Sequence, residues 1–89
     1  MAQLSRKGDQ NQAGGKIVRG ASTVFANSIE VGLNVSDITE HPKGDNHKKA
    51  KTTEGSPTVF AEGVAVLRVG SGNTCGHKIT QGSPDVFVP

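Results

Sequence analysis

The twenty residues 68–87, RVGSGNTCGHKITQGSPDVF, decide how the whole chain is interpreted, because they repeat an earlier stretch. Residues 6–25, RKGDQNQAGGKIVRGASTVF, align with them without a gap at a spacing of 62 residues and share nine of 20 positions. A third, partial copy, GSPTVF, lies between them at residues 55–60. Repetition at this scale is typical of a fold built several times from one small unit. We therefore expect pseudo-threefold symmetry within a single chain.

Each copy ends in a Val-Phe pair that follows a glycine at the same interval. Phe25, Phe60 and Phe87 are therefore equivalent, and they are the only aromatic residues of the chain. Because large apolar side chains are usually buried, we predict that the three rings form a core around the pseudo-threefold centre. Stacking of these rings on a ligand is the less favoured alternative.

The composition limits how a domain of this size can be stabilised. The chain has 89 residues, which we assign to one domain over residues 1–89, and only 33% of them are hydrophobic. The single cysteine excludes an intrachain disulfide, so a metal or a partner protein is the expected source of extra stability. A net charge of +2 does not by itself indicate nucleic-acid binding.

Glycine-rich turns and β-branched residues predict an all-β fold of short strands without a substantial helix. Residues 23–26 and 29–31 are expected to form a hairpin around Asn27-Ser28, and residues 58–60 and 64–66 a second one around Glu62-Gly63. Further short strands are predicted at residues 16–19, 78–80 and 85–88. Residues 1–15 are polar and rich in glycine, and we assign no strand to them.

The candidate metal ligands lie in two short segments with the patterns His-x5-His and Cys-x-His: His41, His47, Cys75 and His77. One cysteine and three histidines match the four nitrogen or sulfur ligands of a tetrahedral structural zinc site. The first repeat has Ala13 and Gly15 at the positions of the cysteine and the last histidine, so these ligands belong to one repeat only. Exposed histidines and a small buried cysteine remain the alternative interpretation.

Residues 38–54 are predicted to form a long polar loop that contains two of the histidines. Its lysines suggest contact with the phosphates of nucleic acid or lipid head groups, but we prefer a solvated loop. These lysines are Lys43, Lys48, Lys49 and Lys51. No aromatic residues that could stack on bases lie among them. Glu40 is the only candidate base for a small zinc-dependent hydrolase, and four protein ligands would close the site to that chemistry.

The repeated segments resemble those of PAAR-repeat proteins, which cap the central spike of type VI secretion systems and contractile phage tails. The resemblance runs from Gly8 to Phe87 and is carried by GSPTVF (55–60), VAVLRVG (64–70), Cys75-Gly76, Ile79 and GSP (82–84). The signature tetrapeptide itself is degenerate, because residues 64–68 read VAVLR. The resemblance implies a pseudo-threefold cone of short strands whose base sits on a trimeric β-helical spike, with one tip per trimer.

The resemblance also implies one structural zinc ion, bound by three histidines and one cysteine. Three of these ligands correspond to His41, His47 and Cys75. The early histidine of the family is replaced in the Ala13-Gly14-Gly15 turn, and the fourth ligand is assigned to His77, the only histidine left.

The implied function is mechanical rather than enzymatic: the tip helps to pierce the target cell envelope. We expect transient contact with that envelope, no nucleic acid and no small-molecule substrate. The N-terminus lacks the apolar run of a signal peptide, so we expect synthesis in the cytoplasm before assembly at the tip of a phage tail or secretion spike. A small zinc-dependent hydrolase and a stand-alone zinc-stabilised adaptor are the alternatives.

Overall fold

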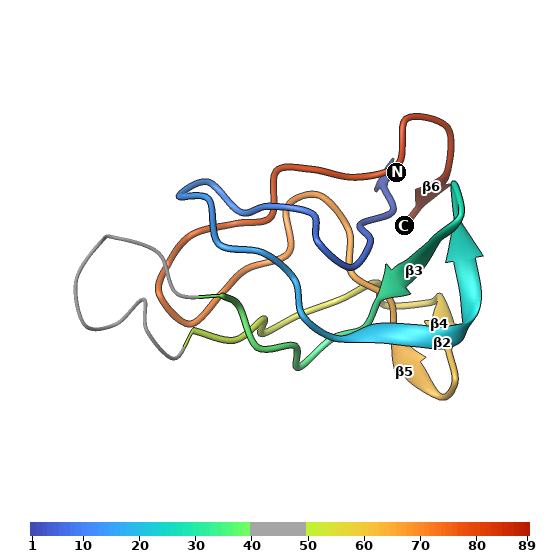
Figure 1. The fold of residues 1–89 in the computed structure, drawn as a ribbon, viewed down its shortest axis with the longest axis horizontal. Coiled ribbons are helices and arrows are strands. Elements are labelled where there is room, and N and C mark those ends of the chain that lie inside the picture. Colours follow the sequence, from blue (N-terminus) through green and yellow to red (C-terminus); the bar gives the residue numbers. More distant parts are fainter. Residues whose placement is uncertain (40–49) are drawn as a thin grey trace.

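The structure, a computed structural model, describes residues 1–39 and 50–89, and these residues form three separate two-stranded antiparallel sheets (Figure 1). The sheets are β1 (Ala2–Gln3) with β6 (Phe87–Val88), β2 (Gly20–Ala26) with β3 (Ile29–Gly32), and β4 (Phe60–Ala61) with β5 (Val64–Ala65). The described residues contain no helix, so none of them forms an apolar helix of membrane-spanning length. The predicted all-β fold is confirmed.

Two of the sheets are the hairpins that the sequence predicts. Both two-residue turns have positive φ at each central residue: 55° at Asn27 and 66° at Ser28, then 53° at Glu62 and 79° at Gly63. These angles belong to a type I′ turn, whose twist matches that of the strands it joins. The third sheet pairs Ala2–Gln3 with Phe87–Val88, and its N-terminal strand was not predicted because it contains no β-branched or aromatic residue.

A closed ring of backbone hydrogen bonds marks the pseudo-threefold axis. The amide of Ser5 donates to the carbonyl of Leu67 (2.9 Å), that of Leu67 to Gly32 (2.8 Å), and that of Gly32 back to Ser5 (2.9 Å). The amide of each of the three residues therefore satisfies the carbonyl of the next. The molecule measures 33 × 23 × 21 Å, and its two shorter dimensions are nearly equal, as a threefold body requires.

Glycines hold the equivalent position before each Val-Phe pair because the backbone is crowded there. A Cβ atom on Gly55 would lie 2.7 Å from the carbonyl oxygen of Val66, and one on Gly82 would lie 2.8 Å from that of Leu4. At Gly20 a Cβ atom would instead meet the side chain of Glu30, 2.6 Å from Oε1 and 2.8 Å from Cβ. The regular glycine spacing in the sequence is therefore a packing requirement at three related places.

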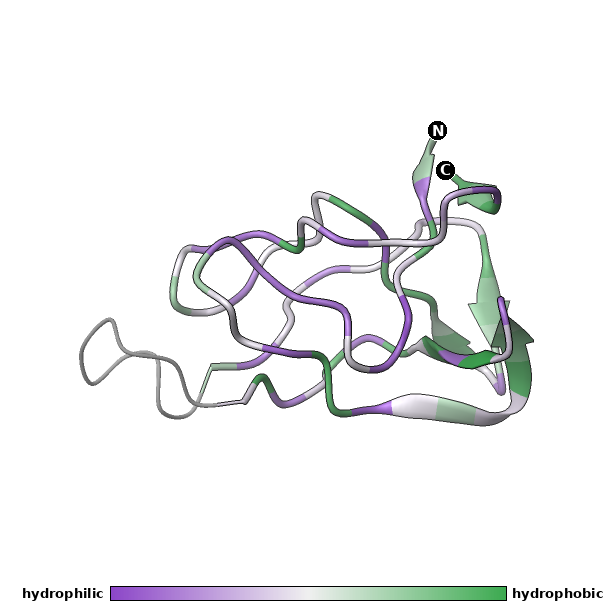
Figure 2. Ribbon diagram, turned by 45° about the horizontal axis from the view of Figure 1, so that its top comes forward, coloured by the Kyte–Doolittle hydropathy of each residue, from purple (hydrophilic) through white to green (hydrophobic). Residues whose placement is uncertain are grey.

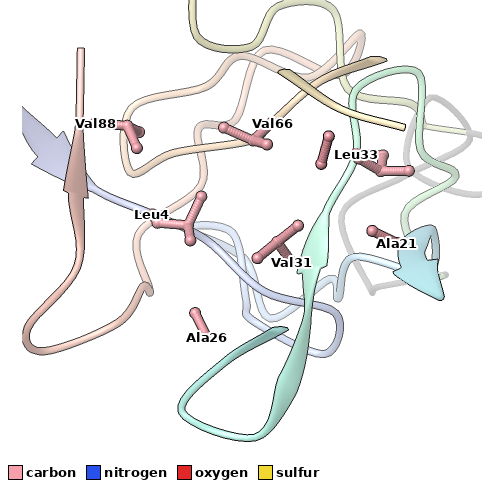
Figure 3. Close-up of a cluster of buried hydrophobic side chains, with 8 residues drawn as sticks. Leu4, Ala21, Ala26, Val31, Leu33, Val66 and Val88 are labelled. Atoms are coloured by element: carbon pink, nitrogen blue, oxygen red, sulfur yellow. The ribbon is translucent and has the colours of Figure 1, made fainter. Parts of the chain in front are cut away.

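The described residues bury two small aliphatic clusters. The first lies among the hairpins (Figure 3) and comprises Leu4, Ala21, Ala26, Val31, Leu33, Ala61, Val66 and Val88. The second comprises Ile17, Ile38, Ala50, Leu67 and Ile79. Neither cluster contains an aromatic ring.

The predicted phenylalanine core is therefore wrong. Phe25, Phe60 and Phe87 are 56%, 59% and 49% exposed, although they lie at equivalent positions in three different sheets. The residue after each phenylalanine is buried instead: Ala26, Ala61 and Val88. Side chains alternate between the two faces of a strand, so burying these small residues turns every ring outward. Figure 2 shows that hydrophobic residues are concentrated in the strands at this end of the molecule.

Candidate metal centre

A tight turn brings two of the predicted ligands together. The amide of Asn73 donates to the carbonyl of His77 (2.8 Å), and the amide of Gly76 donates to the carbonyl of Asn73 (3.0 Å). Gly76 has a φ of +90°, which glycine adopts without the steric cost of a Cβ. The turn places Cys75 Sγ 3.4 Å from His77 Nδ1.

This separation fits two ligands of one zinc ion. With Zn–S near ~2.3 Å and Zn–N near ~2.0–2.1 Å, tetrahedral angles place sulfur and nitrogen about 3.5 Å apart. Both side chains are partly buried, and Cys75 packs against the second aliphatic cluster. The pair is thus positioned to supply one thiolate and one imidazole from the same side of the turn.

The other two predicted ligands, His41 and His47, lie outside the described residues, as does Glu40, the candidate base of a hydrolase. Within residues 1–39 and 50–89, no three His, Cys, Asp or Glu side chains come close enough to hold a metal ion. The described part of the chain therefore contributes two of the four predicted ligands.

The first repeat contains the same turn without the ligands. The amide of Asn11 donates to the carbonyl of Gly15 (2.8 Å), and that of Gly14 donates to Asn11 (3.2 Å). Gly14 has a φ of +89°, almost the value at Gly76. The turn is thus a shared scaffold, and the two ligand positions are occupied by Ala13 and Gly15 in the first repeat.

A buried amide pair that the sequence analysis missed lies beneath these turns. Asn11 Nδ2 donates to Asn73 Oδ1 (2.9 Å), and Asn11 Oδ1 accepts from the amides of Ala13 and Gly15, each at 2.9 Å. Asn73 Nδ2 is buried without a hydrogen-bond partner among the described residues. The available signal was that asparagine is one of the nine positions shared by the two full repeats.

At the other end of the molecule, polar contacts join each sheet to the next. In the first, Glu62 in the β4–β5 turn accepts hydrogen bonds from the hydroxyl (2.6 Å) and amide (3.0 Å) of Thr23 in β2. In the second, Asn27 in the β2–β3 turn donates to Asp85 ahead of β6 (2.9 Å). In the third, Arg68 Nε, after β5, donates to the carbonyl of Pro89 (3.0 Å).

Two of these contacts shift carboxyl pKa values, because a hydrogen bond to the ionised form favours that form. The Thr23 hydroxyl is the largest cause of the lowered pKa of Glu62. The Asn27 amide, followed by the Ser83 hydroxyl, lowers the pKa of Asp85. The hydrogen bonds between the sheets thus favour the ionised form of both carboxyl groups.

A scan against protein-family models matches the PAAR motif over residues 7–81. No curated protein matches the chain. The match spans most of the chain. It includes the turns at Asn11–Gly15 and Asn73–His77, the crowded glycines Gly20 and Gly55, and both predicted hairpins. The chain therefore belongs to the PAAR motif family, whose members form spike tips of contractile injection systems.

Proposed function

We propose that the chain caps a trimeric β-helical spike with its three-sheet end, and that its opposite end forms a zinc-stabilised point that helps to pierce the target envelope. The observation that carries the proposal is the outward position of Phe25, Phe60 and Phe87. Each sheet presents one exposed ring, and the three rings hold equivalent places in the repeats. A single chain with three equivalent docking elements can match a trimer without breaking its symmetry.

The exposed rings have the chemistry of interface anchors. Burying one phenylalanine side chain contributes roughly 1.5–3 kcal/mol relative to leaving it exposed. Aromatic residues are enriched among the few side chains that dominate binding energy at protein interfaces. Three half-exposed rings on one small domain are costly to leave in water, and a permanent partner explains them.

The zinc part of the proposal is supported by the Cys75–His77 pair at 3.4 Å. His41, His47, Cys75 and His77 would hold the ion, which would supply a four-coordinate crosslink between two segments of the chain. Structural zinc in small peptides contributes roughly 10–16 kcal/mol of apparent binding free energy at neutral pH. A crosslink of that size would keep the end of a small domain rigid under load.

The proposed function is mechanical and requires no catalytic residue. Force from a contracting sheath would reach the tip through the spike and the three sheets, and the point would concentrate it on a small area of envelope. The place of action would be the end of a phage tail or of a type VI secretion spike. A stand-alone adaptor would share the metal site but would not bind a spike.

Native mass spectrometry with a trimeric β-helical spike protein from the same source tests the proposal. We expect one chain per trimer, and we expect Phe25→Ser, Phe60→Ser and Phe87→Ser in combination to abolish the complex. Val35→Ser is the matched control, because Val35 is 59% exposed but lies outside the three sheets. Three tips per trimer, no complex, or equal loss in the Val35→Ser control would contradict the proposal.

A further inference from the structure

Three lysines hold equivalent backbone positions, each four residues before one of the equivalent glycines Gly20, Gly55 and Gly82. The carbonyl of each lysine accepts a hydrogen bond from the amide of a residue distant in the sequence, and the amide of the lysine donates to the side-chain oxygen of that same residue. The pairs are Lys16 with Thr39 (3.0 and 2.9 Å), Lys51 with Thr74 (2.8 and 3.1 Å), and Lys78 with Gln12 (3.0 and 3.0 Å). We call Lys16, Lys51 and Lys78 the lysine collar.

The collar lies near the end of the molecule that carries the candidate metal centre. Lys78 directly follows the ligand His77, and Lys51 is held by Thr74 beside Cys75. In Figure 1 the segments around all three lysines lie at the end opposite the strands. The exposed phenylalanines are therefore at one end of the long axis and the collar is near the other.

The ammonium groups of the collar are available to an external anion. All three lysines are exposed. Lys51 forms an ion pair with Asp37 (3.4 Å), in which both side chains are more than half exposed and can separate at little cost. Within the described residues, Lys16 and Lys78 form no ion pair.

The arrangement of the collar selects the kind of polyanion it fits. The three lysines hold equivalent positions about the pseudo-threefold axis, so a broad anionic surface fits the set better than a partner that meets one side of the molecule. A linear polyanion would meet only part of the ring, and no exposed aromatic residue of the described chain lies near it to stack on bases. We infer that the lysine collar binds the phosphate groups of an anionic lipid surface.

The expected strength follows from the charge of such a surface. One lysine near an anionic membrane contributes about fivefold in binding, which corresponds to ~1 kcal/mol, and three contribute about 100-fold. The attraction decays within a Debye length, about 8 Å at physiological ionic strength. The collar would therefore act at contact, and it would orient the tip perpendicular to the surface.

Co-sedimentation of the full chain with phosphatidylcholine vesicles, with and without phosphatidylglycerol, tests the inference. We expect binding only to the anionic vesicles, a loss of about fivefold for each of Lys16→Gln, Lys51→Gln and Lys78→Gln, and a loss of about 100-fold for the triple variant. Replacing all three by arginine should retain binding. Lys7→Gln removes one exposed lysine away from the collar and should change binding little.

Several results would overturn the inference. These are equal binding to both vesicle types, an equal loss in Lys7→Gln, tighter binding to duplex DNA than to anionic vesicles at the same phosphate concentration, or full displacement by that concentration of inorganic phosphate. The collar lies away from the phenylalanines, so the triple glutamine variant should still bind the spike. Failure of the vesicle experiment would therefore leave the proposed spike-capping function untouched.

Discussion

Asn11 and Asn73 hold the same position in the two full repeats, and they meet in the interior, where Asn11 Nδ2 donates to Asn73 Oδ1 across 2.9 Å. The contact ties a turn without metal ligands to the turn that carries Cys75 and His77. Buried polar pairs of this kind are costly to break from one side, because the remaining partner stays desolvated. The two asparagines should therefore differ in what their loss costs.

We expect Asn11→Ala to destabilise the fold by about 2–3 kcal/mol and Asn73→Ala by less, about 1 kcal/mol. Removing Asn11 leaves the amides of Ala13 and Gly15 and the oxygen of Asn73 without partners. Removing Asn73 also deletes a donor that is already unsatisfied among the described residues. Urea unfolding of the metal-free protein measures both. Equal costs, or the reverse order, would show that the pair does not act as described.

The outward phenylalanines yield a second prediction, on stability rather than on binding. Phe25→Ser, Phe60→Ser or Phe87→Ser should change the free energy of unfolding by less than about 1 kcal/mol each, because the rings are already half exposed. Ala61→Leu, one residue along the same strand as Phe60, should cost about 1–3 kcal/mol through overpacking. Thermal melts compare them. A large loss of stability in the serine variants would show that the phenylalanines belong to the core after all.

The sequence predicted the symmetry of the fold better than its interior. Equal spacing of Gly20, Gly55 and Gly82 indicated three related sites, and the structure shows the crowding that requires glycine there. The spacing could not show which face of each strand is buried. A shift of one residue exchanges Phe60 for Ala61, and only the packing of the folded chain shows that Ala61 is the buried one.

The candidate metal site was predictable only in part. The pair Cys75 and His77 was identified from ligand type and spacing, and the structure brings their side chains together. Asn73 was missed because its match to Asn11 in the repeat alignment does not show that the two side chains are buried against each other. β1 was missed because Ala2-Gln3 contains no β-branched or aromatic residue that would indicate a strand.

The links between sheets predict a dependence of stability on pH. Hydrogen bonds lower the pKa values of Glu62 and Asp85 in the folded state. The unfolded state therefore takes up protons at higher pH than the folded state, and the stabilisation present above the ordinary carboxyl range disappears as the pH falls through the lowered values. Both groups lie at the surface, so the effect should be modest.

Thermal melts across the acidic range test this expectation. The melting temperature of the wild-type chain should fall more steeply with acid than that of the Glu62→Gln, Asp85→Asn double variant. Glu54→Gln removes one negative charge elsewhere and serves as the control. If the double variant follows the wild-type acid profile, these hydrogen bonds are not what couples stability to pH.

The last prediction concerns the proposed zinc. The thiolate of Cys75 should be required for tight metal binding, because zinc binds the deprotonated sulfur and each missing ligand weakens a four-coordinate site. We expect the purified chain to hold one zinc ion and a chelator to lower its melting temperature sharply. In Cys75→Ser the melting temperature should already be low, and chelation should change it little. Thr74→Ser, at the neighbouring position, should behave as wild type.

Cobalt(II) substitution separates ligation from a general loss of structure. Wild type and Thr74→Ser should show the charge-transfer absorption of a thiolate bound to cobalt, and Cys75→Ser should lack it. Phe25→Ser changes the opposite end of the molecule and should keep both the absorption and the chelator-dependent melting shift. If chelation leaves the wild-type melting temperature unchanged, the 3.4 Å contact between Cys75 and His77 is a packing contact, and some other interaction must hold this end of the domain together.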